Sequence, residues 1–200
     1  MVAGLGKVAI CNMALGFIGD RTITDLSEAT EEARKCDLFY DIARTQALEA
    51  HDWNFARRRQ ELALSGGTPP IEWTYEYLRP ADLIKARRIQ HPLGHEADAI
   101  AFEMGMDSTG KLPVVYMDEQ TPVLVYTWNQ EDVEVFTTHF VLLLATVLAS
   151  YIVGPLTRDA KKITEATNKA RTALLTAPAM DASEGVEKAP REAEAIRARA

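Results

Sequence analysis

The sequence predicts an α+β fold: an antiparallel-type four-helix core with an inserted small β-sheet or hairpin subdomain and an extended C-terminal arm. Apolar residues recur at helical spacing in two separate parts of the chain, and strand-like alternation fills the part between them. From Ala177 onward almost no large apolar side chains remain. We therefore expect a helical core built from residues 1–60 and 133–176, a β-rich subdomain at 61–132, and an arm at 177–200.

The composition is that of an ordinary globular protein. The chain has 200 residues, of which 47% are hydrophobic and 26% charged, and its net charge is −7. Because binding to DNA in bulk requires a basic surface, this charge argues against it. Cys11 and Cys36 lie far apart in the sequence, so we expect two buried free thiols in a reducing compartment. The N-terminus "MVAGLGKVAI" does not have the pattern of a signal peptide.

Two helices are predicted in the first part of the chain. The first spans Lys7–Ile18 and ends at Gly19. The second is expected to begin at a group of capping and acidic residues that includes Ser27 and Thr30. Such a group indicates a helix start, because acids in a first turn interact favourably with the helix dipole. Its apolar seam has gaps of three and four residues and consists of Ala33, Cys36, Tyr40, Ala43, Ala47 and Ala50.

The stretch "WNFARRR" at 53–59 marks a change of period. Trp53 and Phe55 alternate with Asn54, as on one face of a strand, and we expect them to end the second helix and to attach the first strand to the core. The arginines that follow would form the exposed edge of that strand. Further short strands are predicted up to Trp128, the last two joined by the hairpin-sized link 119–121.

The third helical part has a broad apolar face from Val133 onward. Residues 140–156 carry no charge, but they are at the lower length limit for a membrane span, and Gly154-Pro155 is expected to end them. A buried core helix is the better interpretation. A polar, alanine-rich helix is expected at 157–175.

Several motifs look like chemical sites but lack an essential part. "GMDSTGKL" at 105–112 has Leu112 where a phosphate-binding loop needs Ser or Thr, so a turn between strands is expected. His91 and His95 are separated by Pro92 and Gly94, which remove the helix that such a metal pair needs. The acids Glu28, Glu31, Glu32 and Asp37 show no contrast of environment that would indicate a glycosidase pair. We therefore predict no catalytic residue, cofactor or metal.

One block of sequence resembles a known family. Residues 11–63 combine a helix ending in a Leu-x-x-Ile-Gly element (Leu15 to Gly19), a "DLSE" connector, a long helix with scattered alanines, and the aromatic pair. This block is similar to the tail tubular protein A family, the head-to-tail adaptors of short-tailed bacteriophages. "YEYLRPADLIKARRI" resembles a Tyr-x-Leu-Pro-x-Asp element of that family, although Arg79 here separates Leu78 from Pro80. The similarity extends over residues 7–175, and "FTTHFVLLLATVLASYIVGPLT" resembles the family's third helix.

The resemblance implies a structural role. It implies a homo-oligomeric ring of twelve copies, with a portal protein above, a tail nozzle or tubular protein below, and a channel through which DNA passes without sequence-specific binding. It also implies a place in the neck of the virion after assembly in the host cytoplasm, and no membrane span. A cell-wall (peptidoglycan) hydrolase and a DNA-packaging accessory protein remain as alternatives.

These expectations select candidate contact residues. The acids Glu28, Glu31 and Glu32 could pair with Arg57, Arg58 and Arg59 of a neighbouring copy, although a solvated basic edge is the simpler explanation. Val125 and Tyr126 are expected in a lobe that faces a neighbour or a tail component. Arg191, Ile196 and Arg197 lie in "REAEAIRARA", a run of strong helix formers that is short for an independent helix and is expected to fold on the portal.

Overall fold

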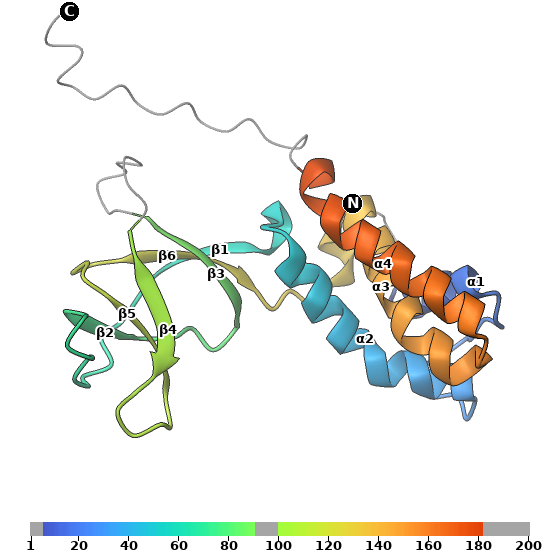
Figure 1. The fold of residues 1–200 in the computed structure, drawn as a ribbon, viewed down its shortest axis with the longest axis horizontal. Coiled ribbons are helices and arrows are strands. Elements are labelled where there is room, and N and C mark those ends of the chain that lie inside the picture. Colours follow the sequence, from blue (N-terminus) through green and yellow to red (C-terminus); the bar gives the residue numbers. More distant parts are fainter. Residues whose placement is uncertain (1–5, 91–99, 182–200) are drawn as a thin grey trace, which may run out of the picture. The chain divides into compact units, whose positions relative to one another are not determined.

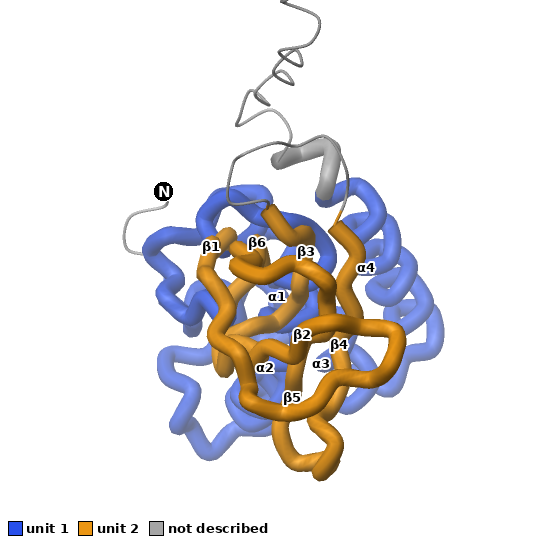
Figure 2. Tube along the Cα trace, turned by 90° about the vertical axis from the view of Figure 1, so that its left-hand side faces the viewer, with its two compact units in different colours: residues 1–56, 129–185 blue, residues 57–128, 186–200 orange. Residues whose placement is uncertain are grey.

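The computed structural model describes residues 6–90 and 100–181, which form two compact units (Figures 1 and 2). Of the described residues, 6–56 and 129–181 form a helical unit, and those between 57 and 128 form a β unit. The helices of the described residues are α1 (Lys7–Ile18), α2 (Glu31–Ala50), α3 (Thr138–Thr157) and α4 (Ala160–Asp181). The strands are β1 (Arg57–Glu61), β2 (Tyr75–Leu78), β3 (Leu83–Gln90), β4 (Phe102–Met106), β5 (Pro113–Met117) and β6 (Val123–Trp128).

The predicted four-helix core is wrong, although the α+β class fits. Helix α3 is the centre of the helical unit, and α1, α2 and α4 each pack mainly against α3 and only slightly against one another (Figure 1). The reason lies in α3, where buried residues occur on nearly all sides: ten of its side chains are buried, among them Phe140, Leu144 and Ile152. A helix that is apolar all round can accept three neighbours, so these neighbours need not close on each other.

The loop between α1 and α2 is ordered by capping. Gly19 ends α1 with a left-handed φ of 72°, and Asp20 N–H donates to the Leu15 carbonyl over 3.0 Å. Thr30 caps α2 by accepting from Ala33 N–H over 3.2 Å. Glu28 lies before the helix and not in its first turn, because its carboxylate accepts from Thr24 and Asp25 in the loop.

The aromatic pair after α2 does not lie on a strand: Phe55 belongs to a short 3₁₀ turn, and Trp53 directly precedes it. Residues Asn54–Ala56 form this turn, so both rings reach one cluster. Phe55 packs against Phe136 and Phe140 with ring centroids 5.5 and 5.0 Å apart, and the Trp53 ring lies 5.2 Å from that of Phe140. Trp53 is buried and donates its indole N–H to the Ala47 carbonyl over 2.9 Å. The pair therefore joins the end of α2 to the start of α3.

A buried arginine holds the chain where it re-enters the helical unit. The side chain of Arg44 is only 4% exposed. Its guanidinium donates to Asn129 Oδ1 over 2.8 Å and to the Gln130 carbonyl over 2.7 Å. These two bonds fix the segment that follows β6 onto α2.

The β unit contains two three-stranded antiparallel sheets, with strand orders β1-β6-β3 and β2-β5-β4. The hairpin predicted for 112–128 is therefore wrong, because β5 and β6 lie in different sheets. Strand β6 pairs with β1 (Arg59 opposite Val125) and with β3, while β5 pairs with β2 and β4 (Tyr116 opposite Glu76 and Glu103). The segment at 107–112 is a turn between β4 and β5, as predicted.

Both sheets contribute to one core in the β unit. The buried members of this core are Leu62, Tyr77, Leu83, Ile89, Val115, Met117, Leu124 and Tyr126. On the other face of β5, the Tyr116 ring lies over Gly105, where an added Cβ would come within 2.6 Å of Tyr116 Cε2. Both faces of β5 are thus covered, and Val114 to Met117 are all buried.

Two predicted helix ends are also wrong. Helix α3 continues through Gly154-Pro155 and ends at Thr157, where Arg158 adopts a left-handed φ of 52°. Helix α4 continues through Pro178 to Asp181, so the first residues of the predicted arm belong to this helix. The rest of the arm, including Arg191, Ile196 and Arg197, lies outside the described residues. Among the described helices, α3 is the one long and apolar enough to cross a membrane, and 56% of that stretch is buried inside the structure.

Candidate functional site: a groove on the helical unit

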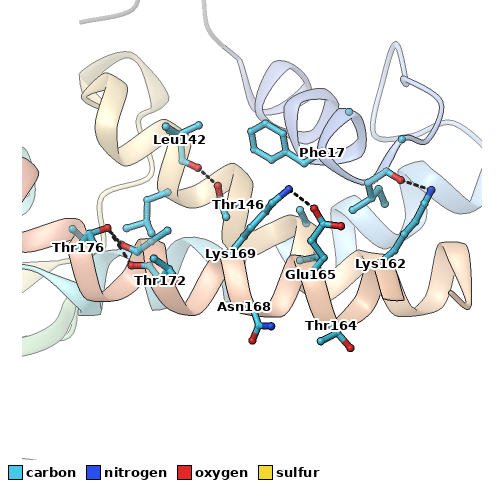
Figure 3. Close-up of a pocket in the computed structure, with 18 of the residues that line it drawn as sticks. Phe17, Leu142, Thr146, Lys162, Thr164, Glu165, Asn168, Lys169, Thr172 and Thr176 are labelled. Carbon is cyan, nitrogen blue, oxygen red and sulfur yellow. Dashed lines mark hydrogen bonds and ion pairs between the residues drawn. The ribbon is translucent and has the colours of Figure 1, made fainter. Parts of the chain in front are cut away.

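A groove on the helical unit is lined by α1, α3 and α4 together (Figure 3). Its volume is about 1330 Å³. Helices α1 and α4 both pack on α3 but have little contact with each other, and the groove lies between them. It is a direct result of the departure from a four-helix core.

The residues that line the groove come mostly from the apolar faces of the three helices. Phe17 of α1 and Leu142 of α3 are 47% and 46% exposed, which is high for large apolar side chains. Helix α4 contributes small side chains, and Trp53 also reaches the groove. The α4 residues are Ala166, Ala173, Ala177, Thr172 and Thr176.

The threonines add little polarity to this surface. Thr146 donates its hydroxyl to the Leu142 carbonyl over 2.7 Å, and Thr176 donates to the Thr172 carbonyl over 3.1 Å (Figure 3). A hydroxyl that is bonded to its own helix does not need a partner from outside. The groove thus offers methyl groups, leucine side chains and the aromatic rings of Phe17 and Trp53 to an occupant.

Charged side chains occur on the α4 side of the groove. Lys169 forms an ion pair with Glu165 at 2.9 Å, and this hydrogen bond lowers the pKa of Glu165. Lys162 donates to the Ile18 carbonyl over 2.9 Å, which covers the end of α1. The α4 side of the groove is therefore partly polar, with Lys161, Lys162, Glu165, Asn168 and Lys169 among its lining residues.

A second apolar surface lies on α2, among residues that do not line the groove. Leu38 and Ile42 are 59% and 51% exposed and lie four residues apart, on one side of the helix. Next to them Phe39 stacks on Tyr151 with ring centroids 5.7 Å apart. A hollow of about 500 Å³ begins at Ile42 and Tyr151. The sequence did not predict this surface, because we expected Leu38 and Ile42 to fill the core beside the apolar seam of this helix.

The predicted acidic candidates have partners inside the chain. Glu32 accepts two bonds from Arg21, the closer one over 2.8 Å, and Glu31 pairs with Arg34 at 2.7 Å. A hydrogen bond to backbone N–H, followed by the Arg21 contact, lowers the pKa of Glu32. Hydrogen bonds from Thr24 lower the pKa of Glu28. Pairing of these acids with another copy would compete with the bonds that each already makes.

The arginine candidates lie on an edge strand. Arg58 bonds Asp82, and its guanidinium carbon lies 3.9 Å from the centre of the Trp128 ring. Arg57 lies opposite Thr127, and Arg59 is exposed beside Val125. These arginines belong to the β unit, whereas the acidic candidates belong to the helical unit.

The expectation for Val125 and Tyr126 changes most. Both side chains are fully buried, and Tyr126 donates its hydroxyl to Gln60 and Asp82 at 3.0 Å. Burial is the main reason that the pKa of Tyr126 is raised. Within the β unit they are interior residues of the middle strand of a sheet, so neither offers an exposed surface for a partner.

The described residues contain no group of three or more His, Cys, Asp or Glu side chains that could hold a metal ion. His91, His95 and Glu96 lie outside the described part of the chain. The helical unit does bring Cys11 and Cys36 together, although 25 positions separate them in the sequence. Both are buried, and their mutual hydrogen bond raises the pKa of Cys11.

Comparison with known proteins gives no assignment: no protein-family model matches the chain, and no curated protein matches it significantly.

Proposed function

We propose that this chain is a structural head-to-tail adaptor of a phage particle. Twelve copies would form a ring between the portal and the tail nozzle and leave a channel for DNA. The resemblance of residues 11–63 to such adaptors supports this proposal, because the same residues determine the helical unit: Gly19 ends α1, Thr30 begins α2, and Trp53 joins α2 to α3.

The observation that carries the proposal is the exposed apolar surface on α2. A closed ring of identical copies needs a heterologous contact, in which two different surfaces of each copy meet. Leu38 and Ile42 give one such surface, and the groove with Phe17 and Leu142 gives another. Exposed apolar patches of this kind mark interaction sites more often than isolated apolar residues do.

The test uses two aspartates on α2. The double variant Leu38→Asp/Ile42→Asp should keep the helical circular dichroism and melting temperature, because both residues are exposed. It should fail to form rings on the portal, since a charge in an apolar contact remains desolvated and unpaired. Native mass spectrometry of the mixture with portal rings measures the number of bound copies.

Ile71→Asp provides the matched control. Ile71 is 98% exposed in the β unit, so this variant adds one of the two negative charges of the double variant at an apolar site outside α2. It should assemble like the unmodified protein. A single bound copy of the unmodified protein on the portal would contradict the adaptor proposal. Full rings from the α2 double variant would remove α2 from the contact.

A further inference from the structure

The helical unit places two thiols opposite each other on neighbouring helices. Cys11 lies on α1 and Cys36 on α2, and both are fully buried as free thiols. Contacts one turn away define how the helices align: the Lys7 ammonium lies 4.9 Å from the centre of the Tyr40 ring, and it pairs with Asp41 at 3.9 Å. Cys11 follows one turn further along α1, and Cys36 lies one turn back along α2, so antiparallel packing brings the two together.

The same alignment continues beyond the two cysteines. Arg21, shortly after the end of α1, pairs with Glu32 in the first turn of α2 at 2.8 Å. The thiols also interact directly, because the Cys11 thiol donates a hydrogen bond to a Cys36 thiolate, which lowers the pKa of Cys36 and raises that of Cys11. Cys36 is therefore the thiol of the pair that ionises more readily, and the thiolate is the form that attacks a disulfide.

We propose that Cys11 and Cys36 form a redox pair that closes to a disulfide and joins α1 to α2, with glutathione disulfide or a similar small disulfide as the oxidant. The Cys36 thiolate attacks one sulfur of glutathione disulfide, which forms a mixed disulfide and releases a glutathione thiolate. This thiolate takes the proton of Cys11. The Cys11 thiolate then attacks the Cys36 sulfur, which forms the Cys11–Cys36 bond and releases the second glutathione. The two cysteines lose two protons and two electrons in total, and one glutathione disulfide becomes two glutathione molecules.

The disulfide adds a constraint where packing contributes little. Helix α1 packs mainly on α3 and only slightly on α2, and its residue Phe17 lines the groove. Because both thiols are buried, an oxidant reaches them only when α1 opens locally. Reducing surroundings keep the two thiols free, whereas in oxidising surroundings the bond holds α1 in its packed position. This inference does not depend on the adaptor function.

The test compares the full chain before and after incubation with glutathione disulfide. Mass spectrometry should show the loss of two hydrogen atoms with no glutathione attached, and a digest without reductant should contain the Cys11 and Cys36 peptides joined. The melting temperature of the oxidised protein should rise by at least about 5 °C, because the bond closes the loop between α1 and α2 in the unfolded chain. Cys11→Ala and Cys36→Ala are matched controls that should give no joined peptide and no such rise.

A second measurement needs no variant. At a fixed ratio of glutathione to glutathione disulfide, the ratio of oxidised to reduced protein should be at least about tenfold higher in native buffer than in urea, because the native packing and the bond stabilise each other. Glutathione adducts on the unmodified protein with no joined peptide, disulfide-linked dimers in place of the internal bond, a melting temperature that does not rise, or equal ratios in buffer and in urea would each overturn the proposal.

Discussion

Replacing Arg44 tests how much the helical unit depends on a single buried cation. Arg44→Met keeps the apolar stem of the side chain, but it removes the donors to Asn129 and Gln130. The Gln130 carbonyl would lose a charge-assisted bond of 2.7 Å, and the residue is only 8% exposed. The substitution therefore leaves the Gln130 carbonyl and Asn129 Oδ1 without the guanidinium that donates to them.

The cost follows from these bonds. A hydrogen bond to a charged group contributes about 1.5–3 kcal/mol, and the variant loses two of them. Methionine is easier to desolvate than arginine, which offsets part of this loss, so we expect the free energy of unfolding to fall by about 3 kcal/mol. For a chain of this size, that corresponds to a fall in melting temperature of about 6–12 °C. Thermal unfolding followed by far-ultraviolet circular dichroism measures it, because the helical unit dominates that signal.

Asp41→Asn is the control for the Arg44 prediction. Asp41 lies 3.4 Å from the guanidinium, but its side chain is 67% exposed. We expect this variant to stay within about 0.5 kcal/mol of the unmodified protein, as for other exposed ion pairs. If Arg44→Met also costs less than about 1 kcal/mol, the two bonds to residues 129 and 130 do not hold the segment as the geometry indicates.

Three further predictions concern other parts of the chain. Val125→Asp or Tyr126→Asp should unfold the β unit by burying an unpaired charge, at a cost of about 3–5 kcal/mol. Urea unfolding followed by the fluorescence of the tryptophans in the β unit would detect the loss of this unit. Intact cooperative unfolding of the β unit in either variant would contradict the prediction. Gly105→Ala should cost about 1–3 kcal/mol in the same assay, since the new Cβ meets the Tyr116 ring; an unchanged midpoint would show that the ring moves freely. Glu28 has a lowered pKa in the folded protein, so its contribution to stability is complete above the ordinary glutamate pKa of about 4.3 and is lost as the pH falls through the lower folded value. The variant Glu28→Gln should therefore lose less stability on acidification than the unmodified protein, as measured by melting curves at several pH values. Parallel pH profiles of the two proteins would refute the role of the hydrogen bonds that Glu28 accepts in the loop.

Local signals in the sequence were sufficient where neighbouring residues decide the structure. The bounds of α1 follow from its apolar run and from Gly19, which takes the left-handed conformation expected of a helix-ending glycine. The turn between β4 and β5, which lies within the predicted turn at 105–112, was also indicated by its local residues. In each case the determining interactions lie within a few positions of one another.

Strand pairing could not be predicted in this way. The short link after Met117 favours a hairpin with Val123, yet each strand has apolar residues on both faces and needs cover on both. This requirement is met when β6 lies between β1 and β3, and β5 between β2 and β4, through pairings of distant segments. The burial of Tyr126 is a consequence of that arrangement and has no local signal.

The groove was not predicted because it depends on how three helices share a fourth. The apolar pattern of α3 indicated burial, but it did not show that α1 and α4 leave space between them. Likewise, the last helix was expected to end at residue 175, whereas α4 continues through Pro178, a residue that lacks the N–H that a helix interior uses. Leu142, exposed within an otherwise buried helix, is the residue that indicates the groove once the packing is known.

The insertion of the β unit between α2 and α3 determines the order in which the protein can fold during synthesis. Residues 57–128 form a continuous stretch whose first and last strands pair, with Arg57 opposite Thr127, so this unit can close as soon as it has left the ribosome. The helical unit must wait, because α1 and α2 pack on α3, which is made only after the β unit is complete. During that interval the apolar faces of α1 and α2 have no partner within the chain, so we expect the nascent helical unit to need chaperone protection more than the β unit does.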